Sequence, residues 1–455
     1  MQIEQPAAGR GARDVVPFRT AVRTWFLVSL QTFGGPAGQI AVMQRVLVDD
    51  KRWLSPRRFQ HALSYCMLLP GPEAQQLAVY TGWLLNGTRG GIAAGGLFVL
   101  PGLVAMLGLS MLYVAYGDTT AVTAVFLGLA PAVVAVVAQA VVRVAKRALL
   151  GPIQVAIAII AFVALTVTSI PFPLVILLAG IGGWLFLRDA PPPSHNAPSD
   201  GSTPLISDEE LHHEAPSLRR TARILGIGVP LWLAPVAAAA LLAGPSSVYV
   251  DQGLFFSGAA LVTFGGAYAV LAYVADRAVE TYGWLQPGEM ARGLALAEST
   301  PGPLIMVVQF VAFLGGFRAA GSLDPWVAGT LAALLTTWVT FLPSFLLVFV
   351  GAPSIERLRG NPNLTSALSG VTAAVVGVIA NLGVFFAVST FFEESVTRSA
   401  GALRVRVPEW STVQPVAFGI FAVAAVLLLR FKLGVLTTLG ICAALGALAV
   451  ASPLV

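Results

Sequence analysis

Two proline–glycine–proline motifs interrupt apolar segments of this 455-residue chain, at Pro70-Gly71-Pro72 and at Pro301-Gly302-Pro303. Proline within a helix removes a backbone hydrogen bond and costs about 3 kcal/mol or more, so each segment is predicted to split into two half-helices. The N–H groups at a half-helix start suit an anion, because the helix dipole adds positive potential there. The alternative is a pair of packed kinks that bind no ligand.

Glycine pairs make a second set of breaks, Gly34-Gly35 and Gly265-Gly266. Glycine tolerates positive φ and close backbone approach, so these positions either line an ion path or allow tight helix packing. At the second proline motif, Thr300 is predicted to cap the following half-helix, with Pro301 in its first position.

Two carboxylates flank the proline motifs. Glu73 directly follows the first motif, and Glu298 lies just before the second. A carboxylate at mid-membrane costs about 2.5–3.5 kcal/mol and is usually paired or lines a water path. Because burial favours the protonated form, both residues are candidates for proton coupling or gating. The alternative is a structural contact with an arginine or a half-helix start.

A dianion also needs positive partners and hydrogen-bond donors. Arg45 follows the first glycine pair by ten residues, and its planar guanidinium can hold an oxyanion with two parallel bonds. Gln75 and Gln76 can donate from the half-helix, and Asn381 is a polar residue within a later apolar segment. Contact with lipid phosphates is the other interpretation of the basic run from Arg45 to Arg58.

The composition places these residues in a membrane protein. The chain is 56% hydrophobic and 11% charged, with a mean hydropathy of +0.81, whereas a soluble protein carries roughly 25% charged residues. The net charge of +5 is spread between apolar segments, which argues against nucleic-acid binding. Cys66 and Cys442 are far apart in the sequence, so neither a disulfide nor a cysteine metal site is expected.

Apolar segments long enough to span a bilayer recur along the chain and predict an all-α, polytopic helical bundle of about thirteen spanning or re-entrant helices. The segments are 24–43, 62–85, 91–116, 121–142, 152–169, 172–187, 224–244, 254–275, 293–317, 326–350, 366–390, 413–430 and 433–451.

The chain divides into a cytoplasmic segment 1–23, a first membrane repeat 24–187, a hydrophilic linker 188–223, an extra helix 224–244 and a second repeat 245–455. If every segment crosses, most Lys and Arg residues fall on the side of the N-terminus, which is predicted to be cytoplasmic. The basic run from Arg45 to Arg58 falls on the wrong side. Either the first segment is re-entrant or broken, or the run folds into a protected cavity.

An internal duplication relates the two repeats. With a shift of 231 residues, 33–72 aligns with 264–303 without a gap, and twelve of the forty pairs are identical. A shift of 242 aligns Pro101 with Pro343. Because the helix at 224–244 has no counterpart, an odd number of crossings separates the repeats and inverts the second. Inverted repeats are common in secondary transporters, whose substrate site lies near mid-membrane.

The chain resembles the chromate ion transporter family in its long form with two homologous domains. The resemblance covers nearly the whole chain outside the termini and the linker. The motifs that carry it are TFGGPAGQ (32–39), LPGPEAQQ (69–76), Gly90-Gly91, GLAPAVVAVV (128–137), FGG (264–266), ESTPGP (298–303) and GVTAAVVGVI (370–379). The family implies a protein of the cytoplasmic membrane that exports chromate and confers resistance to it, with sulfate as the usual competitor.

An enzyme is not expected, because the sequence shows no metal-spaced His/Cys set, nucleophile motif or phosphate loop, and no cofactor or metal is predicted. A secondary mechanism linked to the membrane potential or to protons is favoured. A sulfate transporter and an anion channel stay open as alternatives, as do the coupling ion and the oligomeric state, including a homodimer.

Overall fold

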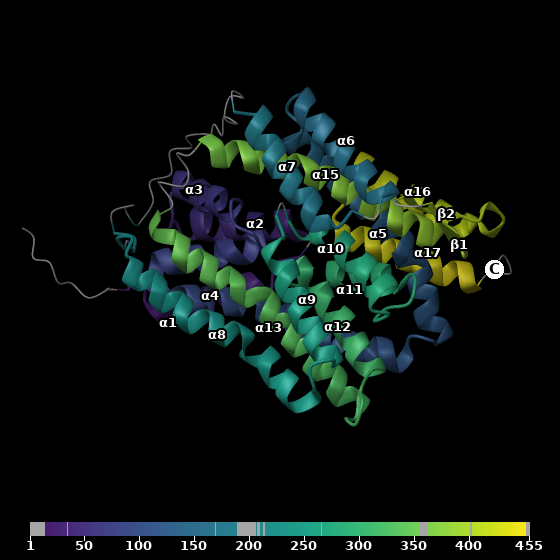
Figure 1. The fold of residues 1–455 in the computed structure, drawn as a ribbon, viewed down its shortest axis with the longest axis horizontal. Helices are drawn as coiled ribbons and strands as arrows, with labels where there is room; N and C mark the ends of the chain where they lie inside the picture. Colours follow the sequence, from purple (N-terminus) through teal and green to yellow (C-terminus); the bar gives the residue numbers. More distant parts are fainter. Residues whose placement is uncertain are drawn as a thin grey trace, which may run out of the picture.

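The computed structural model describes residues 14–33, 35–168, 170–188, 206, 210–212, 214–264, 266–354, 362–400 and 403–451. These residues form a helical bundle (Figure 1), which confirms the predicted fold class. Five helices are long and apolar enough to cross a membrane. They are α4 (Glu73–Tyr116), α5 (Thr120–Ala148), α8 (Leu218–Ala243), α13 (Pro325–Gly351) and α15 (Pro362–Phe391).

Shorter helices surround the four breaks that the sequence predicted. In the first repeat these are α1 (Phe18–Ser29), α2 (Gly35–Gln44), the π-helical turn η1 (Arg45–Asp50) and α3 (Pro56–Cys66). In the second repeat they are α9 (Val248–Leu261), α10 (Ala267–Asp276), the π-helical turn η2 (Arg277–Thr281), α11 (Glu289–Ser299), the 3₁₀ turn η3 (Leu304–Met306) and α12 (Val307–Arg318).

Each proline break is the tip of a hairpin and not a kink within a crossing helix. Tyr65 of α3 and Tyr80 of α4 lie at similar distances before and after the first break, and their ring centroids are 5.1 Å apart. At the second break, Gly293 of α11 packs against the ring of Phe310 of α12. The limbs of each hairpin therefore run antiparallel, and both limbs lie on the same side of the break.

The glycine break of the second repeat is a hairpin as well, because the rings of Phe255 in α9 and Tyr273 in α10 lie 5.2 Å apart. In the first repeat, α1 and α2 occupy the equivalent positions, and Arg45 at the end of α2 reaches back to Gln31 at the end of α1. Each repeat thus contains two re-entrant hairpins.

The sequence left open whether its apolar segments span the membrane or are re-entrant, and four of them fold back as hairpins: 24–43, 62–85, 254–275 and 293–317. Their limbs are mostly 10 to 14 residues long, which at 1.5 Å per residue is about 15–21 Å, shorter than a 30 Å hydrocarbon core. A hydropathy window sums the apolar residues of both limbs, so a folded hairpin and a continuous span give the same signal.

The start of the chain and the first repeat share one side of the bundle, here named the N-terminal side. The Val15 amide donates to the Leu85 carbonyl at 3.0 Å, and the Asn86 side chain donates to the Val16 carbonyl at 2.6 Å. At Asn86 and Gly87, α4 reverses direction with non-helical backbone. The long limb 88–116 then runs to the opposite side, here named the C-terminal side.

The second repeat enters the bundle from the C-terminal side. Helix α8 begins near the N-terminal side, where Arg220 Nη1 donates to the Phe349 carbonyl at 2.7 Å. It runs antiparallel to α13 through two reciprocal indole bonds of 3.0 Å, Trp232 to Val339 and Trp338 to Leu231. Three long helices, α4, α5 and α8, therefore separate the repeats, and this odd number inverts the second repeat as predicted.

Paired short helices complete each repeat on the outside of the long helices. The hairpin of α6 (Pro152–Val167) and α7 (Phe172–Phe186) packs on α15, with Gly183 against Gly370 and Gly377 against Ala158. The hairpin of α16 (Pro415–Ala425), the π-helical turn η6 (Val426–Arg430) and α17 (Val435–Ala451) packs on α5, with Gly128 against Gly446. Glycine at these contacts lets the helix backbones approach closely.

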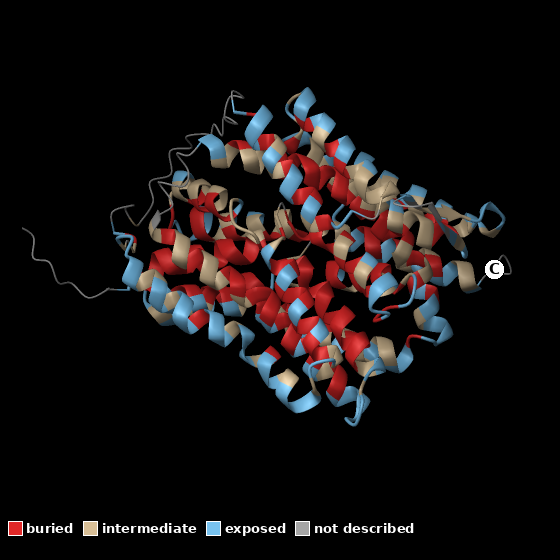
Figure 2. Ribbon diagram, in the orientation of Figure 1, coloured by how far each residue is buried: buried red, intermediate tan, exposed pale blue. Residues whose placement is uncertain are grey.

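A feature that an all-α prediction missed is the antiparallel pair of strands β1 (Ser395–Ala400) and β2 (Leu403–Pro408), which pairs Val396 with Val407. The 3₁₀ turn η4 (Ala352–Ser354) follows the end of α13, and the 3₁₀ turn η5 (Trp410–Thr412) precedes α16. Buried residues follow the middle of the bundle, and exposed residues follow its outer helices (Figure 2). The exposed residues include large apolar side chains such as Ile160, Phe186 and Leu241, as expected of a surface that faces lipid.

Candidate functional site

The hairpin tips of the two repeats are joined by a reciprocal pair of backbone hydrogen bonds. The Gly71 amide donates to the Thr263 carbonyl at 2.7 Å, and the Gly302 amide donates to the Thr32 carbonyl at 2.9 Å. The shift of 231 residues maps each bond onto the other. The proline break of each repeat is therefore held against the glycine break of the other, and all four breaks meet in the middle of the molecule.

The backbone at the proline breaks requires glycine. Gly71 and Gly302 have φ of +129° and +102°, a region in which residues with a Cβ atom are strained. A Cβ atom on Gly302 would lie 3.1 Å from the Cα of Gly102 in α4. The equivalent neighbour of Gly71 is Ser344 of α13, which the shift of 242 aligns with Gly102.

Three half-helices begin next to one another at this junction. Glu73 opens α4, and its carboxylate faces Gly266, which caps the start of α10; a Cβ on Gly266 would lie 3.5 Å from Glu73 Oε1. Gly35 opens α2 and faces the hydroxyl of Tyr268 in α10. The positive ends of three helix dipoles therefore point toward one small region, which favours negative charge there.

Both predicted carboxylates lie at the junction but have different surroundings. Glu298 is only 1% exposed, accepts a hydrogen bond from the Tyr268 hydroxyl through Oε1, and its Oε2 has no hydrogen-bond partner among the described residues. Glu73 is half-buried. Glu298 thus has one tyrosine bond and one open oxygen, which suits a group that takes up and releases a proton.

The glutamines of the junction have divided roles. Gln76 Nε2 donates to the Pro70 carbonyl at 2.7 Å and so supports the break itself. Gln39 of α2, which the sequence analysis did not single out, donates to the Gly302 carbonyl at 2.5 Å. Gln75 is fully buried, and neither its amide nitrogen nor its amide oxygen has a partner in the part of the chain that the structure describes. Of these three residues, Gln75 retains a donor for a bound anion.

The predicted helix cap at Thr300 is wrong. Thr300 ends α11, and its hydroxyl donates to the Ala297 carbonyl at 3.0 Å. The next helical turn begins only at Leu304, with Pro303 before it. The two prolines hold residues 301–303 in an extended turn, because each also restricts the residue that precedes it.

Arg45 does not contact the break residues. It is exposed, and its Nη2 donates to Gln31 Oε1 at 2.9 Å. Arg143 and Arg147 are basic residues of α5, and α5 packs against α11, the helix that carries Glu298. The Arg45 side chain folds back as far as Gln31, one residue before Thr32, whose carbonyl accepts from the Gly302 amide.

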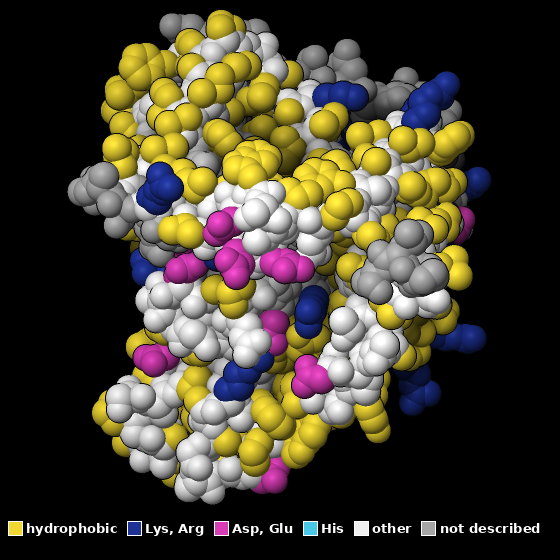
Figure 3. All heavy atoms as spheres, turned by 90° about the vertical axis from the view of Figure 1, so that its right-hand side faces the viewer, with side chains coloured by type: hydrophobic (Ala, Val, Ile, Leu, Met, Phe, Trp, Pro, Cys, Tyr) yellow, Lys and Arg dark blue, Asp and Glu magenta, His cyan; other side chains and the backbone are white. Residues whose placement is uncertain are grey.

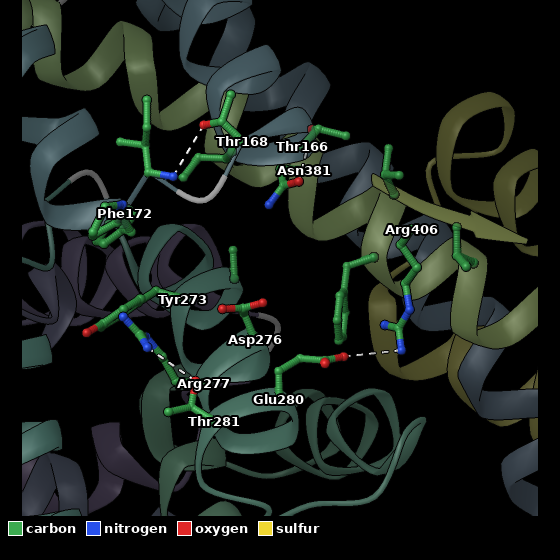
Figure 4. A pocket seen from close by; sticks show the side chains of 17 residues that line it. Thr166, Thr168, Phe172, Tyr273, Asp276, Arg277, Glu280, Thr281, Asn381 and Arg406 are labelled. Carbon is green, nitrogen blue, oxygen red and sulfur yellow. Dashed lines mark hydrogen bonds and ion pairs between the residues drawn. The ribbon is translucent and has the colours of Figure 1, made fainter. Parts of the chain in front are cut away.

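Asn381 lies in a cavity of about 300 Å³ between the α6–α7 hairpin, α10, η2, α15 and β2 (Figure 4). Its Oδ1 accepts a bond from the Thr166 hydroxyl at 3.0 Å. Of the remaining predicted site residues, Gly35, Gly71, Gly266 and Gly302 lie at the junction, whereas Gly34 and Gly265 are outside the described residues. Tyr268 was missed because a tyrosine in an apolar segment gives no signal of its partner thirty residues away.

The comparisons with known proteins agree with the duplicated architecture. The family model described as "Chromate transporter" matches the chain twice, at residues 19–184 and 250–447. The chain belongs to the chromate transporter family. Among its relatives, a chromate transport protein of Pseudomonas aeruginosa is 34% identical over 77% of this chain and 76% of that protein. A chromate transport protein of Cupriavidus metallidurans is 28% identical over 76% of this chain and 77% of its own length. No solved structure matches the chain.

Proposed function

We propose that this protein exports chromate across the cytoplasmic membrane, from the N-terminal to the C-terminal side of the bundle, and thereby confers chromate resistance. The observation that carries the proposal is the reciprocal junction of Gly71 with Thr263 and of Gly302 with Thr32. It gathers half-helix starts from both family repeats around a small central region. The names of the relatives supply chromate as the substrate.

The anion binds where α2, α4 and α10 begin, with the amide of Gln75 as a further donor. An ionised Glu298 or Glu73 would repel a dianion at this place. Protonation removes that repulsion, and the Tyr268 hydroxyl holds the Glu298 side chain in position. Protonation of the carboxyl groups therefore controls entry of the anion, as in a secondary transporter linked to the potential or to protons.

The direction of transport follows from charge. Residues 45–58 of the first repeat carry five basic and two acidic side chains, whereas the equivalent residues 276–289 carry one basic and three acidic ones. Basic segments stay on the cytoplasmic side, so the N-terminal side is assigned to the cytoplasm. A potential of 100 mV, negative inside, is worth about 2.3 kcal/mol per charge. A dianion leaving the cell gains roughly 4.6 kcal/mol.

Sulfate uptake is the second candidate function, because sulfate is a tetrahedral dianion of similar shape. It must oppose the potential that favours export, and so it needs coupled cations or protons. The potential therefore favours export over uptake for either dianion, and the names of the relatives favour chromate.

The test uses everted membrane vesicles, in which export appears as uptake. Vesicles that contain the protein should accumulate labelled chromate above empty-vector vesicles, in proportion to the imposed potential, and cells should gain resistance. Equal accumulation and unchanged resistance would contradict the proposal. Rescue of a sulfate-starved transport mutant would favour sulfate uptake, and flux that never exceeds equilibrium with the potential, at every pH gradient, would indicate a channel.

A further inference from the structure

We propose that the cavity between α10, η2, α15 and β2 is an oxyanion-binding station on the exit path, in which Arg277 and Arg406 hold the departing dianion. This inference rests on the proposed function and extends it to a second site. The cavity of about 300 Å³ can accommodate a tetrahedral oxyanion with part of its hydration shell, since one water occupies about 30 Å³ in the liquid.

The cavity lies between the central junction and the C-terminal side. Its floor is α10 and η2, the re-entrant limb that starts at the junction beside Glu73 and carries Tyr268. From Gly266 to Arg277 the chain advances eleven residues, about 16 Å along a helix. Arg277 therefore lies at the far end of the limb that begins at the junction, on the C-terminal side of it.

Hydrogen-bond donors from three separate elements line the cavity (Figure 4). Arg277 belongs to η2; its Nη1 donates to the Thr281 hydroxyl at 3.2 Å, and its guanidinium lies 5.8 Å from the centre of the Tyr273 ring. Arg406 comes from β2. Asn381 of α15 uses its oxygen to accept from Thr166 and turns its amide nitrogen toward the open space (Figure 4). Two guanidinium groups and an amide are a donor set for an oxyanion.

Arg406 is positioned by its neighbours but is not locked. Its Nε donates to the Ser395 hydroxyl at 3.0 Å, and its guanidinium lies 5.2 Å from the centre of the Phe385 ring. Its ion pair with Glu280 of η2 is 3.5 Å long, which exceeds the 2.7–2.9 Å of a tight charged hydrogen bond. A dianion can therefore replace Glu280 on Arg406, and Glu280 can take Arg406 back when the anion leaves.

The acidic residues of the cavity argue for brief binding of an anion and against a cation site. Asp276 and Glu280 also line the cavity, and neither carboxylate is without a partner. A cation would have to displace those partners while facing two arginines. For an anion, the two carboxylates weaken the hold of the arginines, which suits a station from which the substrate must depart. Acidic side chains also gather on the face of the molecule at the C-terminal side (Figure 3).

The experiment measures inhibition by the exported anion. Right-side-out vesicles are loaded with labelled chromate, and the outside chromate concentration that halves the efflux rate is determined. Loss of a charged hydrogen bond changes binding by about tenfold or more. Arg406→Gln and, as a second variant, Arg277→Gln should therefore raise this concentration about tenfold. Glu280→Gln should lower it several-fold, because the competing carboxylate is gone.

The matched control is Arg398→Gln, an exposed arginine on strand β1 of the same β-hairpin, which should leave the inhibitory concentration unchanged. If Arg406→Gln and Arg277→Gln are both inserted in the membrane and are inhibited like the wild type, the exit station is refuted while chromate export stands. If wild-type vesicles release no chromate, the proposed function itself fails.

Discussion

The two repeats share the backbone of their broken helices but not the polar side chains at the junction. The reciprocal bonds of Gly71 and Gly302 have the same partners at a shift of 231. The π-helical turns repeat as well, with Lys51 bonded to Val46 and Tyr282 to Arg277, both at 2.9 Å. The junction thus has an approximate twofold relation in its main chain.

The side chains break this relation. The counterpart of Glu298 is Met67, and the counterpart of Glu73 is Leu304. The residue equivalent to Tyr268 is Ala37. Duplication therefore supplies the broken helices twice, while each ionisable group occurs once. The observed asymmetry places one of the two carboxylates on each repeat.

The largest effect is expected where the shared backbone is broken. Gly302→Ala places a side chain at a φ of +102° and against the Gly102 backbone. A left-handed conformation costs a residue with a Cβ roughly 1–2 kcal/mol, and the contact adds to it. Chromate efflux should fall at least about tenfold, the effect of 1.4 kcal/mol on a barrier, with Gly71→Ala similarly affected.

Gly108→Ala in α4 is the control, because nothing lies within 4 Å of its added Cβ. It should retain wild-type flux in the same vesicle assay. Wild-type flux in Gly302→Ala would show that the junction is not the functional backbone.

Glu298→Gln sharpens the difference between the side chains. The amide can still accept the bond from Tyr268 but cannot exchange a proton. We expect efflux to decrease at least about tenfold and to lose the pH dependence that the wild type shows. The measurement is the initial rate in everted vesicles at several pH values under a fixed potential.

Met67→Gln, at the equivalent position of the other repeat, should keep the pH profile of the wild type. If the efflux rate of Glu298→Gln depends on pH as the wild-type rate does, proton coupling belongs to another group. Glu73 is then the next candidate.

The smallest effect is expected from Arg45→Ala. This exposed side chain bonds only to Gln31 among the contacts described, and exposed polar pairs contribute about 0–1 kcal/mol. Chromate resistance should change less than about fivefold. Arg143→Gln should cost more, because Arg143 belongs to α5, which packs against the helix that carries Glu298; its control is the neighbouring exposed Lys146→Gln. The opposite order in a resistance assay would return the anion-binding role to Arg45.

Much of this comparison could be predicted from the sequence. Composition and hydropathy predicted the helical bundle, and the shift of 231 residues predicted the repeats and both sets of breaks. Strands β1 and β2 left a signal in residues 403–407, where apolar and basic side chains alternate. The sequence could not show whether the chain turns back at a break or continues across the membrane, because a hairpin and a spanning helix have the same apolar content. The contact between Tyr268 and Glu298 forms only because the chain turns back.

The basic run from Arg45 to Arg58 was the one sign in the sequence that the first apolar segment folds back. If that segment crossed the membrane, the run would lie on the non-cytoplasmic side, against the positive-inside rule. In the structure this run lies between two re-entrant hairpins on the N-terminal side. The violation therefore disappears once the fold is known.

The most direct test of the inverted hairpins is labelling of one cysteine at a time with a membrane-impermeant thiol reagent. Asp50 and Thr281 are equivalent exposed residues at the ends of η1 and η2, Ser217 is an exposed residue before α8, and the native Cys66 and Cys442 are buried. Asp50→Cys should react from the same side as Ser217→Cys, and Thr281→Cys from the other side only. Reaction of Asp50→Cys from the side opposite to Ser217→Cys would mean that the first segment crosses, and would contradict the paired re-entrant hairpins.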